Sequence, residues 1–80
     1  MVTLPCVVDT SALIAIALAE PGATALCDRL LTADARFIGA PSVLEAEIVL
    51  AQRIPNAPMS AIADLLAALD IEEIPLTPVM

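Results

Sequence analysis

Asp9, Ser11 and Glu45 are the residues of this 80-residue chain whose types and positions best suit chemistry. Asp9 follows the apolar segment 4–8 and precedes a second apolar segment, residues 12–19. A continuous apolar run of strand length is typical of a strand buried on both faces of a parallel sheet. Ligands of such sheets bind beyond the carboxyl ends of the strands. A carboxylate at that position can therefore hold a metal ion or take part in acid–base chemistry.

Glu45 follows a second expected strand, residues 36–40, and lies early in the helix expected after it. If the two strands are parallel, their carboxyl ends share one edge of the sheet, and Asp9 and Glu45 meet there. Converging carboxylates repel each other unless one is protonated or a cation lies between them. A divalent cation relieves this repulsion, activates water and stabilises charge on a phosphoryl oxygen. Ser11 would orient the Asp9 carboxylate or a metal-bound water.

Both acids also have a purely structural interpretation, which the sequence leaves open. Ser42-x-x-Glu45 fits a capping box, in which the glutamate reaches back to the backbone at the start of its helix. Asp9 fits a simple helix N-cap. The other acids carry weaker signals. We interpret Glu47 as solvated or paired and the later acids as a soluble face and a strand edge, whereas Asp28 and Asp34 carry no special signal; the later acids are Asp64, Asp70, Glu72 and Glu73.

The charge composition limits the functions that the chain can perform. Ten acids stand against three arginines, with no lysine and no histidine, so the formal net charge is −7. Nucleic-acid binding depends on cations that displace counterions from phosphates, so this segment attracts RNA or DNA weakly by itself. Without histidine, a metal site would rest on carboxylates, which suit Mg²⁺ or Mn²⁺ better than zinc.

Hydrophobic residues make up 60% of the chain, and the mean hydropathy is +0.95. So many aliphatic residues in a small domain should leave apolar surface uncovered, which marks an interface. We therefore expect a partner or a larger domain rather than a free monomer. No apolar run reaches the ~20 residues of a membrane-spanning helix, and the first residues lack the basic start of a signal peptide. Cys6 and Cys27 lie in apolar settings and are expected as buried thiols in a reducing cytoplasm.

Hydrophobic periodicity and turn residues predict three strands and four helices. The expected strands cover about residues 3–8, 36–40 and 71–75, and the expected helices about 11–19, 23–32, 42–53 and 59–69. The order β-α-α-β-α-α-β predicts an α/β sandwich with a mainly parallel sheet. The chain stops soon after its last strand, and we expect residues 1–80 to be the amino-terminal part of one domain.

Three stretches resemble the PIN-domain family, and within it the toxins of VapBC-type toxin–antitoxin modules. They are V-V-D-T-S-A-L-I-A-I at 7–16, E-P-G-A at 20–23 and A-P-S-V-L-E-A-E-I-V-L at 40–50. The resemblance implies a PIN-like α/β/α sandwich that is incomplete at its C-terminus. It places Asp9 on the first acid of the family, Ser11 on its supporting polar residue and Glu45 on the second acid. The later aspartates of the family have no counterpart here.

The function that this resemblance implies is a single-strand-specific endoribonuclease with Mg²⁺ or Mn²⁺ held by Asp9 and Glu45. It also implies a homodimer, and an antitoxin that inhibits the enzyme by lying across apolar helices. Because acids are missing, a second interpretation stays open: a truncated, inactive PIN-like module that binds an antitoxin or its own copy. A third is phosphoryl transfer through an aspartyl nucleophile at Asp9, which is weakened because Ser11 stands where such phosphatases carry a second aspartate.

Overall fold

The computed structural model describes residues 5–75, which form seven elements in the predicted order β-α-α-β-α-α-β. The first predicted strand reaches back to Thr3, and that part lies outside the described residues. The element bounds are β1 (Cys6–Val7), α1 (Thr10–Ala17), α2 (Ala23–Leu31), β2 (Arg36–Gly39), α3 (Ala40–Arg53), α4 (Ala61–Ala68) and β3 (Ile71–Ile74).

The three strands form one parallel sheet in the order β1-β2-β3. Cys6 and Val7 lie opposite Arg36 and Phe37, and β2 pairs with β3 from Arg36↔Ile71 to Gly39↔Ile74. The predicted α/β class with a parallel sheet is confirmed. Because the strands are parallel, their carboxyl ends share one edge of the sheet.

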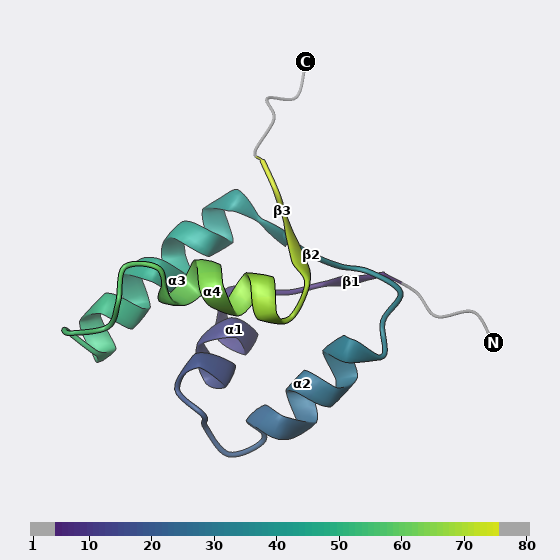
Figure 1. The fold of residues 1–80 in the computed structure, drawn as a ribbon, viewed down its shortest axis with the longest axis horizontal. Helices are drawn as coiled ribbons and strands as arrows, with labels where there is room; N and C mark the ends of the chain where they lie inside the picture. The colour runs from purple at the N-terminus through teal and green to yellow at the C-terminus, as the bar shows by residue number, and fades with distance from the viewer. Residues whose placement is uncertain (1–4, 76–80) are drawn as a thin grey trace.

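All four helices lie on one side of this sheet (Figure 1). A parallel crossover is almost always right-handed, because of the twist of the strands. Two right-handed crossovers that add strands in the same direction, from β1 to β2 to β3, place their helices on the same face. The described residues therefore supply two layers of an α/β/α sandwich, in agreement with the expectation of an incomplete one.

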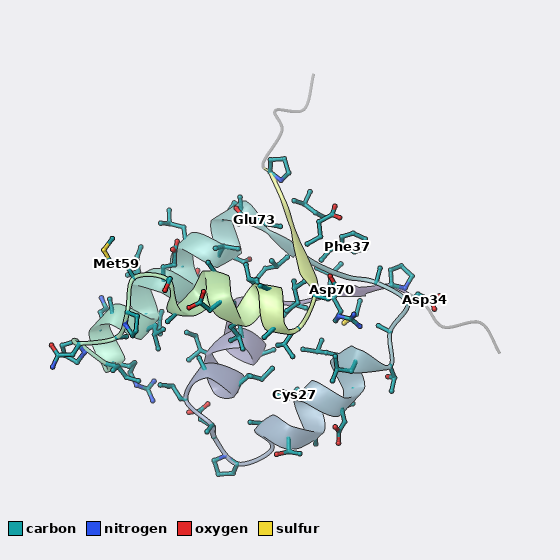
Figure 2. The ribbon with its side chains drawn as sticks, viewed as in Figure 1. Cys27, Asp34, Phe37, Met59, Asp70 and Glu73 are labelled. Atoms are coloured by element: carbon teal, nitrogen blue, oxygen red, sulfur yellow. The ribbon has the colours of Figure 1, made fainter. Side chains whose placement is uncertain are left out.

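Side-chain burial follows these two layers. Toward the helices, Val8, Ile38 and Ile71 expose only 3%, 0% and 7% of their surface. On the opposite face Val7 is 79% exposed, and Phe37 lies on the side away from the helices (Figure 2). Among residues 5–75, no helix covers that second face.

The hydrophobic core lies between the sheet and the helices, and each of the four helices contributes buried side chains to it. Helix α1 packs against both α2 and α3. The apolar side chains of α2 and α3 are only partly buried. Leu30 and Val43 are in the core, whereas Leu31, Leu44 and Ile48 are 55%, 59% and 51% exposed. The expected surplus of exposed apolar side chains is confirmed.

No helix within residues 5–75 has the length and apolarity needed to cross a bilayer. The two cysteines, Cys6 and Cys27, are both partly buried and form no disulfide.

Candidate functional site

Asp9 caps the N-terminus of α1. Its backbone is extended, and its Oδ1 atom accepts hydrogen bonds from the backbone N–H of Ala12 at 2.9 Å and from the Ser11 hydroxyl at 3.1 Å. Both bonds use the same carboxylate oxygen, and within residues 5–75 no group donates a hydrogen bond to Oδ2. The capping interpretation of Asp9 is therefore correct, and it leaves one oxygen of the carboxylate for another ligand.

Glu45 does not belong to a capping box. Helix α3 begins at Ala40 with Gly39 as its N-cap, so Ser42 is already the third helical residue. The predicted start was two residues too late because Pro41, which lacks an N–H group, is tolerated within the first turn of a helix. Glu45 is exposed in the second turn and bonds to no cap. The structural interpretation of this acid was wrong.

The N-termini of α1 and α3 are joined at the carboxyl edge of the sheet. The Thr10 hydroxyl donates a 3.2 Å hydrogen bond to the backbone carbonyl of Ser42. From the strand register, with Val7 opposite Phe37, Asp9 lies level with Gly39, the residue before α3. Both candidate acids therefore follow neighbouring strands and belong to two helices that are bonded at their first turns.

An open depression runs between α1 and α3, and we call it the α1–α3 groove. It is lined by Thr10, Ser11, Ile14, Glu20, Glu45, Val49 and Arg53. Ser11 and Glu45 thus share one surface, and Asp9 is connected to that surface through its hydrogen bond with Ser11. Glu20 and Arg53 were not singled out from the sequence as site residues. The only sequence signal for Glu20 is its place in the E-P-G-A stretch.

The acids of this region offer few donors to a metal ion. No cluster of three or more metal-binding side chains occurs within residues 5–75. Asp9 and Glu45 would therefore act as a pair. Mg²⁺ is commonly held by one or two carboxylates, with water and substrate phosphates completing its coordination. The chemistry of the pair fits a hard divalent cation, and their role as ligands stays a prediction.

Arg36 has a structural role that its position in the sequence does not indicate. Its guanidinium donates to the carbonyls of Leu69 at 2.7 Å, Leu30 at 2.8 Å and Ala33 at 3.2 Å, with Asp70 at 3.7 Å. Leu30 and Ala33 lie at the end of α2, and Leu69 is the C-cap of α4. The last carbonyls of a helix lack the regular partner four residues further on. The Leu30 carbonyl accepts a 3.2 Å hydrogen bond from the N–H of Ala33. Arg36 adds a donor to each of the three carbonyls and so links the ends of α2 and α4 to β2.

The chain matches no protein-family model and no curated protein. The resemblance to the PIN-domain family therefore rests on the three sequence stretches named above. The structural feature that bears on function is the placement of Asp9, Ser11 and Glu45 in the N-terminal parts of two helices that follow neighbouring parallel strands.

Proposed function

We propose that this chain is the amino-terminal part of a PIN-type endoribonuclease that cleaves single-stranded RNA and is neutralised by a cognate antitoxin. The observation that carries the proposal is the common position of Asp9 and Glu45, after neighbouring parallel strands and on helices joined by the Thr10–Ser42 hydrogen bond. This is where α/β sheets bind their ligands. The proposed compartment is the cytoplasm, which holds both RNA and reduced thiols.

The side chains at this edge of the sheet would have separate roles in catalysis. Asp9 and Glu45 would hold Mg²⁺ or Mn²⁺, and the Ser11 hydroxyl fixes the Asp9 carboxylate through Oδ1, which leaves Oδ2 available as a ligand. When bound, the metal ion would activate a water molecule and stabilise negative charge on the phosphate. Hydrolysis would form a bond from the water oxygen to phosphorus and break the bond from phosphorus to one ribose oxygen, which would leave with a proton released by the water. Further acids, and basic residues that hold RNA, would come from the rest of the domain.

The proposal predicts a selective effect of Glu45→Gln. We expect this change to lower Mg²⁺-dependent cleavage of a labelled single-stranded RNA by at least about 100-fold. Mutating a residue that only hydrogen-bonds to a metal ligand already lowers metal affinity or activity by about 10–100-fold, and Glu45 is proposed as a ligand itself. Glu45 is exposed and makes no cap bond, so the fold should be unaffected. The readouts are the cleavage rate and Mn²⁺ binding measured by calorimetry.

Glu47→Gln provides the matched control. Glu47 is an exposed acid of the same helix, but it lines a different depression, between α3 and the segment that precedes α4. Glu47→Gln removes one negative charge, as Glu45→Gln does. Because Glu47 lies outside the α1–α3 groove, cleavage and Mn²⁺ binding should stay within about twofold of the parent protein. Equal losses in the two variants would show that only overall charge matters and would remove Glu45 from the site.

A second candidate function is an interaction module without catalysis, and the surface of α3 favours it. Leu44 and Ile48, four residues apart on α3, form an exposed apolar stripe, which we call the α3 stripe. Met59, 98% exposed, projects from the segment between α3 and α4 (Figure 2). Among the described residues, α3 carries two exposed large apolar side chains and α2 carries one, Leu31, whereas α1 and α4 carry none.

We propose a second copy of this chain as the partner of the α3 stripe, in line with the predicted homodimer. Ile48→Gln is expected to raise the dimer dissociation constant by about 10-fold or more, since burying an isoleucine is worth about 1.5–3 kcal/mol. Leu31→Gln, on α2, is a control of similar exposure and should leave it unchanged. Sedimentation velocity measures both. A wild-type protein that sediments as a monomer at all concentrations would contradict this role.

A further inference from the structure

Arg53 is the cation of the α1–α3 groove. The chain has three arginines and no lysine. Arg36 exposes only 10% of its side chain and is engaged by backbone carbonyls, and Arg29 lies on α2 and does not line the groove. Arg53, at the end of α3, lines the same surface as Ser11 and Glu45. It is therefore the cation of this chain that can meet an anion bound along the groove.

In the free protein Arg53 is paired with Glu20. Their nearest atoms, Nη2 and Oε2, are 3.9 Å apart, and the side chains are 57% and 43% exposed. Exposed ion pairs at such a distance contribute little to stability and are screened by solvent and salt. A phosphate, with its charge and its accessible oxygens, can replace this carboxylate and bind the guanidinium in a bidentate manner.

The backbone holds Glu20 in this position. Its N–H donates to the Ala15 carbonyl at 2.9 Å, and its own carbonyl accepts from the N–H of Ala23 at 2.9 Å. Gly22, with φ of +92°, gives the turn a left-handed conformation that residues with a side chain adopt rarely. The E-P-G turn therefore places a carboxylate beside Arg53 at the far end of the groove from Thr10.

The spacing along α3 matches an extended ligand. Glu45, Val49 and Arg53 are four residues apart and form one row along the helix. At 1.5 Å per residue, Arg53 lies about 12 Å along the helix axis from Glu45. A phosphate held by Arg53 is thus separate from one at the carboxylates, and both can belong to one strand lying in the groove.

We infer that Arg53 binds a backbone phosphate of the RNA other than the one that is cleaved, and that Glu20 pairs with Arg53 until this phosphate replaces it. This inference rests on the proposed function and names the substrate contact on this chain. Arg53 is therefore a binding residue, and the Glu20 carboxylate competes with the RNA phosphate for its guanidinium. In a groove lined by two acids, Glu20 and Glu45, this contact offsets the repulsion of the incoming strand.

The experiment measures binding of a fluorescent single-stranded RNA by anisotropy, with the Asp9→Asn protein as the parent and Mg²⁺ present. Adding Arg53→Gln is expected to weaken binding about 10-fold and to reduce the slope of log Kd against log salt by about 1. Adding Glu20→Gln should instead strengthen binding about threefold. The combination of both should bind like Arg53→Gln alone, because the competitor matters only when Arg53 is present.

Arg29→Gln is the matched control, an exposed arginine outside the groove, and should leave both affinity and salt slope unchanged. Equal losses for Arg29→Gln and Arg53→Gln, or unchanged binding in Arg53→Gln, would overturn the inference. So would weaker binding in Glu20→Gln, which would mean that the ion pair supports the site. Cleavage by Asp9→Asn reports on the proposed function separately, because it does not depend on either residue.

Discussion

Asp9→Asn is expected to reduce Mg²⁺-dependent RNA cleavage about 1,000-fold while leaving the protein as stable as before. Asparagine is as good an N-cap as aspartate, so it can still accept the hydrogen bonds from Ala12 and Ser11. What the variant loses is the negative charge that would hold the cation. Loss of one well-placed electrostatic group in an active site typically costs 10²–10³-fold. Single-turnover cleavage and urea unfolding measure the two quantities.

Asp9→Ala separates the two roles of this residue. It removes both the charge and the cap, so cleavage should fall as in Asp9→Asn, and the free energy of unfolding should fall by about 1 kcal/mol as well. Mn²⁺ affinity should decrease equally in both variants. Undiminished cleavage by Asp9→Asn would leave Asp9 with its capping role alone and would refute the nuclease proposal.

Arg36→Met is expected to lower the free energy of unfolding by a large fraction of the total. Methionine keeps much of the side-chain volume but removes the guanidinium donor from the carbonyls of Leu30, Ala33 and Leu69, of which Leu30 keeps the N–H of Ala33. Unsatisfied buried polar groups cost about 1–3 kcal/mol each, and partial access of water reduces the sum. We expect a loss of about 2–4 kcal/mol, against a total of roughly 4–12 kcal/mol for a chain of this length.

Asp70→Asn tests whether the ion pair or the carbonyl contacts matter. Asp70 is 95% exposed at 3.7 Å from Arg36, and its backbone is left-handed, with φ of 52°. Asparagine tolerates that conformation, so the variant removes only the charge and should unfold at nearly the same urea concentration as the wild type. A large effect of Asp70→Asn together with a small effect of Arg36→Met would reverse this assignment.

Local signals in the sequence were sufficient to predict the order and type of the elements. The apolar run before Asp9, the Pro21-Gly22 turn and the segment 54–58 separate the strands and helices as the structure has them. These signals work because burial and turn geometry act over a few residues. Helix ends were less accurate: α3 begins at Ala40 and α4 at Ala61, each two residues from the expected start.

The candidate site could be predicted only in part from such local signals. The positions of Asp9 and Glu45 after two strands were predicted, and parallel pairing puts those strand ends at one edge. The capping box at Ser42 was wrong, because sequence spacing alone does not show where a helix begins. Glu20 and Arg53, 33 positions apart, gave no common pattern and were brought together only by the packing of α1 against α3.

The amino-acid sequence by itself determined the α/β class, the parallel direction of the strands and the acid at the first strand end, because each depends on short-range patterns of apolar residues. Tertiary structure alone decided that all four helices cover one face of the sheet, which follows from strand order and crossover handedness. It also decided that Arg36 donates hydrogen bonds to carbonyls at the ends of two helices, while Arg53 lines the α1–α3 groove. Contacts between distant segments depend on how the layers pack, and the packing of layers cannot be predicted from a local sequence pattern.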